Sequence, residues 1–336
     1  MRCVTLTSLV LGTLFSVVPS LALAAPTVSA REAAAAASYP APITLKGSYS
    51  THDPSALCKD SKGTYFMFSE GGMSTKTSTD RINWKDVGFV FTSAPWVLSY
   101  TGGVLDLWAP DCHYIDGKFH LYYAAATWGN LDLSAVFYAT STTGMPGSWT
   151  NHGQIISASH ANYQAIDPTL IVDGSKWYLA FGSLLKGIFL LDPSTGLRSG
   201  SSITNIAQKS GVEEGAVIDS DPSVPLQSLV KVGSYYYLFV SVGSCCDGAS
   251  STYHVLVGRS KSITGPYLDE SGTSMLSGGG TTILASHDSI HGPGGQSVFQ
   301  DKDGWIIDYH YYPDSGDSLL GINHLDFSSG WPVVIA

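Results

Sequence analysis

The chain has 336 residues, of which 44% are hydrophobic and only 13% are charged. Its 17 basic and 27 acidic residues give a net charge of −10 at pH 7. This composition excludes a disordered protein, and an acidic chain without a Lys/Arg run is a poor partner for nucleic acid or an anionic membrane. The 11% of aromatic residues suits a neutral ligand that stacks on aromatic rings.

The first residues have the pattern of a secretory signal peptide. Arg2 precedes an apolar run from Leu9 to Val18, and small residues follow at Ala22–Ala24. This apolar run is too short for a membrane span. We therefore predict a signal peptide over residues 1–24, a leader over 25–42 and one folded domain over 43–336, and we expect a secreted, extracellular protein.

Four cysteines remain once Cys3 is removed with the signal peptide: Cys58, Cys112, Cys245 and Cys246. Four cysteines allow three pairings in an oxidising compartment, and the sequence does not choose among them. Their spacing matches no zinc pattern. The adjacent Cys245 and Cys246 could bond to each other, remain buried thiols or pair with separate partners.

A turn followed by an aromatic-rich alternating strand recurs five times along the chain. A glycine marks each turn, at Gly63, Gly117, Gly174, Gly233 and Gly304. Hairpin turns need glycine, and bulky alternating residues fit strands that pack between sheets. Five long units of four strands each predict an all-β, five-bladed β-propeller, because a β-sandwich or a β-helix would not readily give five such similar units.

Carboxylates recur just before these hairpins, where the innermost strand of each blade should begin. They are Asp53, Asp111, Asp167 and the pair Glu213–Glu214. Several carboxylates around one axis suit either hydrolysis of a glycosidic bond, which needs an acid and a base, or a hard cation such as Ca²⁺. Each aspartate taken singly also fits a structural turn, since Asp-Pro commonly opens turns.

The chain from about Ile43 to Ala336 resembles the endo-1,5-α-L-arabinanases of glycoside hydrolase family 43. The resemblance rests on short motifs in the right order: His52-Asp53-Pro54-Ser55, Leu107-Trp108-Ala109-Pro110-Asp111, Ala165-Ile166-Asp167-Pro168-Thr169, Glu214-Gly215-Ala216, Cys245-Cys246-Asp247-Gly248 and Gly330-Trp331-Pro332. It implies a secreted five-bladed propeller that cuts the arabinan side chains of pectin.

The resemblance also implies catalytic roles. Asp53 corresponds to the general base, Glu214 to the general acid and Asp167 to the carboxylate that tunes and orients the acid. Glu214 is preferred over Glu213 because two small residues follow the family's acid. The implied mechanism inverts the anomeric centre, with base and acid ~6.5–9.5 Å apart.

Substrate contacts are expected from a further set of residues. Trp108, Trp128 and Tyr163 are candidate platforms for furanose rings, although each also fits an ordinary core or rim aromatic. The resemblance places the remaining sugar contacts at Gly129, Gln164, Ala165, Ile166 and Ser183.

Two departures from the family pattern concern the site. Leu184-Leu185 stands where members often carry an aromatic pair, which predicts a changed sugar subsite. Gly295 replaces a histidine that bacterial members associate with a bound cation, and His291 or His310 could compensate. No cofactor is expected for the chemistry, and a structural Ca²⁺ or Na⁺ at the propeller axis is the metal that the resemblance allows.

We therefore expect a monomeric glycoside hydrolase that acts on arabinan and arabino-oligosaccharides and binds neither nucleic acid nor a membrane. One rival is an exo-acting arabinofuranosidase or β-xylosidase of the same family, which would share the three carboxylates. The other is a non-catalytic carbohydrate-binding propeller.

Overall fold

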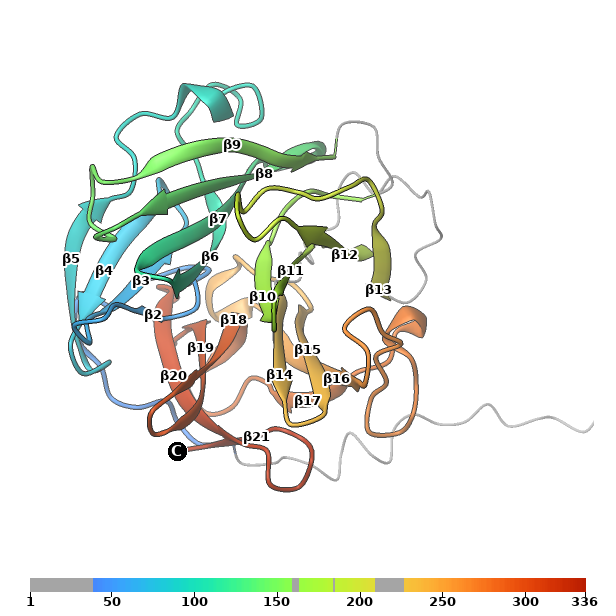
Figure 1. Cartoon of the computed structure of the whole chain (residues 1–336). Coiled ribbons are helices and arrows are strands. Elements are labelled where there is room, and N and C mark those ends of the chain that lie inside the picture. Colours follow the sequence, from blue (N-terminus) through green and yellow to red (C-terminus); the bar gives the residue numbers. More distant parts are fainter. Residues whose placement is uncertain (1–38, 159–162, 184, 209–226) are drawn as a thin grey trace, which may run out of the picture. The chain divides into compact units, whose positions relative to one another are not determined.

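The computed structural model describes residues 39–158, 163–183, 185–208 and 227–336 (Figure 1). These residues belong to one compact unit, Tyr39–Ala336, and form five sheets arranged in a ring. Their only helical segments are three 3₁₀ turns, at Pro95–Val97, Gly248–Ser250 and Met275–Ser277. The predicted all-β, five-bladed propeller is confirmed.

Each blade is a meander of antiparallel strands, with one additional strand in blade 1. Blade 1 contains β1 (Lys46–Gly47), β2 (Cys58–Lys59), β3 (Tyr65–Ser69), β4 (Ser74–Ser78) and β5 (Asn83–Phe89), and blade 2 contains β6 (Trp108–Ile115), β7 (Lys118–Thr127), β8 (Asn130–Ser141) and β9 (Thr150–Ser157). Blade 3 contains β10 (Thr169–Asp173), β11 (Lys176–Phe181), β12 (Leu185–Leu191) and β13 (Thr204–Gln208). Blade 4 contains β14 (Gln227–Val232), β15 (Tyr235–Val242), β16 (His254–Ser260) and β17 (Thr281–Leu284), and blade 5 contains β18 (His291–Asp301), β19 (Gly304–Tyr312), β20 (Leu319–Asp326) and β21 (Val333–Ile335).

The five marker glycines lie where the repeat predicts them, at the turn between the first and second antiparallel strands of each blade. All five have a positive φ, which glycine adopts without steric cost. The inner strands β2, β6, β10, β14 and β18 follow one another around the axis, and neighbours in this series contact each other from β2 to β18.

Alternation along the second strand of each blade builds the cores between blades. In β3, Phe66 and Phe68 pack into the core shared with blade 2, whereas Tyr65 and Met67 pack into the core shared with blade 5. Successive side chains of a strand point to opposite faces, so a strand that is apolar throughout fills two cores. The same division recurs in every blade, which explains the continuous apolar runs of the repeat.

The first and last blades close the ring through hydrogen bonds and buried charge. The Ile43 N–H donates to the Ile322 carbonyl at 3.0 Å. Asp301 accepts from the Lys59 ammonium at 3.0 Å and from the Tyr65 hydroxyl at 2.5 Å. A disulfide between Cys58 and Cys112 joins the inner strands of blades 1 and 2.

The predicted boundaries at residues 24 and 42 stay predictions. Residues 1–38 lie outside the described ranges, and the described unit begins at Tyr39.

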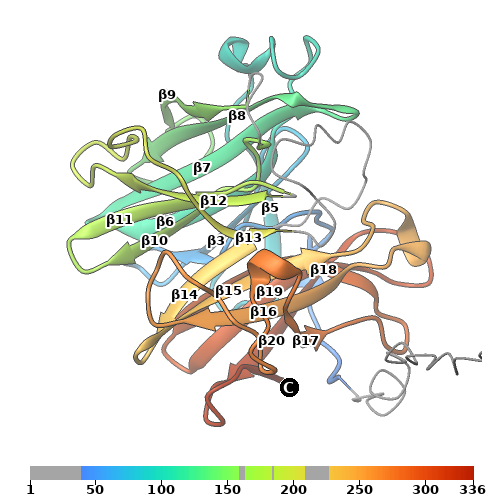
Figure 2. The same cartoon turned by 90° about the vertical axis from the view of Figure 1, so that its right-hand side faces the viewer.

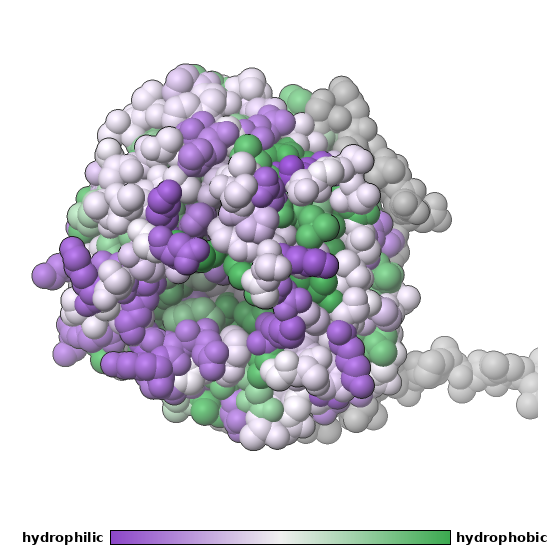
Figure 3. All heavy atoms as spheres, in the orientation of Figure 1, coloured by the Kyte–Doolittle hydropathy of each residue, from purple (hydrophilic) through white to green (hydrophobic). Residues whose placement is uncertain are grey.

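Two further views show the arrangement of the blades and the character of one face. Blades 2 and 3 lie above blades 4 and 5 in the turned view (Figure 2). Hydrophilic and hydrophobic side chains are interspersed on the face in Figure 3, which is hollowed near the centre of the ring. Within the described ranges, no helix has the length and apolar character needed to cross a lipid bilayer.

Candidate active site

In four blades, one residue at or shortly before the start of the inner strand has the same unusual backbone conformation. The residue before a proline has a positive φ at Asp53 (45°), Ala109 (37°), Asp167 (55°) and Gly292 (52°). This region is costly for residues other than glycine, and such strain tends to cluster at functional sites. Asp53 and Asp167 therefore occupy equivalent positions of blades 1 and 3, where the repeat had placed them.

Asp111 has a different environment from these two aspartates. It lies two residues beyond Ala109, and its Oδ2 accepts the Leu170 N–H at 2.6 Å. The same oxygen lies 3.0 Å from His113 Nε2. Asp111 thus ties inner strand β6 to inner strand β10, so its role is structural.

Asp53 lies against two stacked histidines near the axis. His310 on β19 is fully buried, and its Nδ1 is 3.1 Å from Asp53 Oδ1. The His52 ring stacks on it, with centroids 4.1 Å apart, and His52 Nδ1 is 3.6 Å from the same Asp53 oxygen. The same His52 Nδ1 also lies 2.7 Å from Glu70 Oε1. The other ring nitrogen, Nε2, lies 2.7 Å from Tyr312 Oη.

The charges in this cluster hold Asp53 ionised. Burial would raise the pKa of Asp53, but the His52 charge and the contact with His310 outweigh burial and bring that pKa below its usual range. Burial would lower the pKa of His52, yet the charges of Asp53 and Glu70 raise it well above its usual value. Burial and the His52 charge lower the pKa of His310 to about 4. These shifts favour the charged form of His52 and the neutral form of His310.

Asp167 lies in the opposite electrostatic situation. Burial raises the pKa of Asp167 well above its usual range; the Lys186 charge opposes this, and the charges of Asp53 and Glu70 reinforce it. Lys186 on β12 is itself fully buried, and burial lowers its pKa to about 7. Its ammonium also donates to the Gly182 carbonyl. The site thus combines one carboxylate whose pKa is lowered with one whose pKa is raised.

The predicted aromatic platform begins at Trp108, the first residue of β6. Its indole N–H donates to Asp106 Oδ2 at 2.9 Å, and its ring packs with Ile166. The Trp128 ring lies 6.1 Å away, and Trp128 is 55% exposed. Gly129 follows at the turn between β7 and β8, where an added Cβ would meet nothing within 4 Å. The structure brings Trp108, Trp128 and Ile166 together, with Gly129 next to Trp128 in the chain.

The remaining predicted contact residues come from two segments that are bonded to each other. The Ile166 carbonyl accepts the Gly182 N–H at 2.8 Å, which brings residues 164–166 beside Ser183. The Ala165 N–H donates to Ser134 Oγ at 2.9 Å. Gln164 is half-buried, and its Oε1 accepts no hydrogen bond from the described residues.

Tyr163 and Leu185 both pack against the protein interior. The half-buried Tyr163 ring meets Phe181 edge-on at 5.0 Å beside the core between blades 2 and 3, a contact that fits an ordinary core or rim aromatic. Leu185 is buried on β12, and Leu184 lies outside the described ranges. Glu213 and Glu214 lie outside them too.

The two candidate metal ligands are in different places. His291 Nε2 pairs with exposed Asp314 at 2.7 Å, whereas His310 lies beside Asp53. His52, Asp53 and His310 bring their donor atoms within 4.8 Å of one another. However, Ca²⁺ takes six to eight oxygen ligands, and this set offers a single carboxylate beside two imidazoles. These residues do not fit Ca²⁺.

Gly295 is required where it stands. It has a φ of 61°, and an added Cβ would lie 2.5 Å from His310 Nδ1 and 2.6 Å from Asp53 Oδ1. Any side chain here would displace the carboxylate or the imidazole. The His310 ring lies against this position, whereas His291 pairs with Asp314.

Gly295→Ala is expected to lower kcat for polysaccharide hydrolysis roughly 10–100-fold, because even a small displacement of a reacting group is costly. Gly117→Ala is the matched control, since Gly117 has a φ of 79° with nothing within 4 Å of an added Cβ. Steady-state kinetics on both purified variants decide the matter. Equal activity in the two would mean that Asp53 and His310 do not hold a reacting group.

Three residues of this cluster were not singled out from the sequence. Glu70 follows β3 directly, Tyr312 ends β19, and Lys186 lies within the apolar run of β12. A lysine in an otherwise apolar strand was a visible signal for Lys186. Glu70 and Tyr312 carried none, because their relation to Asp53 depends on ring closure between blades 1 and 5.

Comparisons with known proteins agree with this geometry. Residues 42–332 match the profile "Glycosyl hydrolases family 43". The chain is 40% identical to arabinan endo-1,5-alpha-L-arabinosidase A of Aspergillus aculeatus, over 88% of this chain and 94% of that protein. Its fold is similar to Cellvibrio cellulosa alpha-L-arabinanase complexed with arabinohexaose, with a TM-score of 0.77 and 30% identity over 85% of this chain and 95% of that one.

A third similar structure has a different stated activity. It is an exo-1,5-alpha-L-arabinanase from a bovine ruminal metagenomic library, with a TM-score of 0.76 and 31% identity over 87% of this chain and all of that one. The profile match spans nearly the whole folded unit, and the fungal relative is aligned over most of both chains. This protein therefore belongs to family 43 of the glycosyl hydrolases.

Proposed function

We propose that this protein hydrolyses internal α-1,5-L-arabinofuranosidic bonds of arabinan, the pectin side chain, with inversion. Asp53 acts as the general base, Glu214 as the general acid and Asp167 as the carboxylate that tunes the acid. The observation that carries the proposal is the position of Asp53, a carboxylate before an inner strand that lies 3.1 Å from His310 and 3.6 Å from His52.

Each step of the reaction has a residue that suits it. Ionised Asp53 takes a proton from a water molecule, which then attacks the anomeric carbon. Glu214 gives its proton to the leaving glycosidic oxygen as that bond breaks. A base that acts through water, and not as a nucleophile, inverts the anomeric centre and requires ~6.5–9.5 Å between the two carboxyl groups.

Asp167 and Lys186 adjust the charge near the acid. An ionised Asp167 repels a second negative charge and so favours a protonated neighbour. Burial opposes the ionised form of Asp167, and the charge of Lys186 supports it.

Arabinan is the substrate because the relatives named above are arabinanases and one structure among them holds arabinohexaose. Trp108 and the exposed Trp128 offer ring faces for furanose units. Gln164, Ala165, Ile166 and Ser183, with Gly129, are the further sugar contacts we propose.

We also propose that the protein acts outside the cell as a monomer. Its two disulfides, Cys58–Cys112 and Cys245–Cys246, suit an oxidising compartment. A signal peptide over residues 1–24 would direct the chain there. N-terminal sequencing of the protein from culture medium tests both the export and the cleavage after Ala24.

The test of activity is chromatography of the products formed early from linear debranched arabinan. Internal cleavage releases arabino-oligosaccharides of mixed length, and proton NMR of the new reducing ends reports inversion. Arabinose alone would instead indicate an exo-acting enzyme like the ruminal relative. Retarded migration in an arabinan gel without products would indicate a binding module and contradict the proposal.

A further inference from the structure

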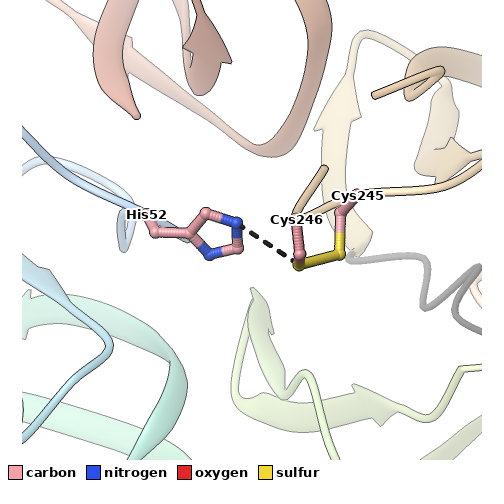
Figure 4. Close-up of side chains that lie close together, drawn as sticks. All are labelled: His52, Cys245 and Cys246. Atoms are coloured by element: carbon pink, nitrogen blue, oxygen red, sulfur yellow. Dashed lines mark hydrogen bonds between the residues drawn. A yellow bond between two sulfur atoms is a disulfide. The ribbon is translucent and has the colours of Figure 1, made fainter. Parts of the chain in front are cut away.

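A disulfide between two adjacent cysteines lies beside the proposed catalytic base. Cys245 and Cys246, in the loop that follows β15, are bonded to each other. Figure 4 shows the His52 ring directed at this bond from blade 1, with His52 Nε2 3.6 Å from Cys246 Sγ. Cys245 is buried and Cys246 is exposed, so the bond lies at the surface next to His52, which in turn contacts the proposed base.

A chain of hydrogen bonds runs from this disulfide to His52, whose Nδ1 lies 3.6 Å from Oδ1 of the base. The Cys246 N–H donates to Tyr312 Oη at 3.0 Å. The same Tyr312 oxygen lies 2.7 Å from His52 Nε2. On its other edge His52 faces Glu70 and Asp53 through Nδ1. Segments from blades 4, 5 and 1 are thus joined at a single tyrosine oxygen.

The position of Tyr312 Oη matters because this oxygen is the hydrogen-bond partner of His52 Nε2. His52 Nδ1 faces the carboxylates of Asp53 and Glu70, at 3.6 and 2.7 Å. His52 Nε2 has Tyr312 Oη, 2.7 Å away, as its hydrogen-bond partner. That oxygen is located in turn by the Cys246 N–H. A bond between neighbouring cysteines closes a small ring around the intervening peptide, so the Cys246 N–H has little freedom to turn away.

We infer that the Cys245–Cys246 disulfide is a positioning element for the hydrolytic reaction: through the Cys246 N–H and Tyr312 it fixes His52 against Asp53. This inference rests on the proposed role of Asp53 as the base. The disulfide acts through other groups and does not itself take part in the chemistry. Its loss displaces His52, and Asp53 then loses the neighbouring imidazole that helps to hold it in place.

The experiment removes each disulfide separately. In the double variant Cys245→Ala with Cys246→Ala, kcat on debranched arabinan is expected to fall roughly 10–100-fold with little change in KM. Its melting temperature should stay close to that of the wild type, because a disulfide between neighbours closes almost no loop. The matched control, Cys58→Ala with Cys112→Ala, opens a loop with a sequence separation of 54. It should lower the melting temperature and leave kcat unchanged.

A double-mutant cycle tests the proposed route. Tyr312→Phe alone should reproduce most of the loss in kcat, since it removes the shared oxygen. Added to the Cys245/Cys246 variant, it should cost little more, because both changes break the same chain. Additive losses would mean that the disulfide and Tyr312 act separately, and the inference would be wrong.

A readout without substrate separates this inference from the proposed function. The imidazole signals of His52 in proton–nitrogen NMR, assigned with His52→Asn, should show a protected Nε2–H in the wild type and in the Cys58/Cys112 variant. That protection should be lost in the Cys245/Cys246 variant. If the wild type does not cut arabinan, the proposed function fails, and this signal still decides the inference. Unchanged kcat and an unchanged His52 signal, or a higher KM with kcat intact, would overturn it.

Discussion

Asp53→Ala is expected to lower kcat on debranched arabinan by about 10²–10⁴-fold, the usual contribution of a general base. Asp53 belongs to none of the five cores between blades, and alanine already occupies the equivalent backbone position of blade 2 as Ala109. The fold should therefore survive the substitution. Steady-state kinetics give the loss, and circular dichroism with thermal melting checks the structure.

The matched control for this substitution is Asp116→Ala. Asp116 is an exposed aspartate with a φ of 50°, in the turn between β6 and β7. Its replacement introduces alanine in the same strained conformation without touching the axis, so activity should remain normal. Near-normal kcat in Asp53→Ala as well would show that another group activates the water.

The fold was predictable because every blade has the same physical requirements, which leave a repeated pattern in the sequence. Each blade needs a tight turn and a second strand that is apolar on both faces, as Tyr65 to Phe68 show in blade 1. These two features recur at every marker glycine. The order of the antiparallel strands follows the chain within each blade, whereas the parallel pairing of β1 with β5 in blade 1 does not.

The site was predictable only as far as the local motif reached. The Asp-Pro steps identified Asp53 and Asp167, and both occur in the strained conformation. The same pattern counted Asp111 as a third carboxylate at the axis. Asp111 instead accepts a hydrogen bond from the Leu170 N–H, between blades 2 and 3. Acidity beside a proline does not reveal whether a neighbouring N–H already satisfies the carboxylate.

The surroundings of the base could not be predicted, because they are assembled from distant blades. His310 lies 257 residues from Asp53, and Cys246 lies 194 residues from His52. No spacing rule connects such pairs. Gly295 illustrates the difficulty, since a missing histidine and a neighbouring His310 are related only through the space that a Cβ would fill.

Glu214→Gln is expected to cost a similar factor, about 10²–10⁴ in kcat on arabinan, whereas Glu213→Gln should be tolerated. Glutamine keeps the shape of the acid but has no proton to give to the leaving oxygen. Of this adjacent pair, only Glu214 precedes the two small residues Gly215 and Ala216, so Glu213→Gln is the matched control. The reverse pattern would move the acid by one residue.

The leaving group separates the acid from the base. In an aryl arabino-oligosaccharide the aryl leaving group departs without needing a proton. Glu214→Gln should therefore recover most of its activity on such a substrate. Asp53→Ala should not recover, because the water must still be activated whatever group leaves. Recovery in Asp53→Ala instead would exchange the two roles. Recovery in neither variant would indicate that the residue at 214 holds the sugar rather than donating a proton.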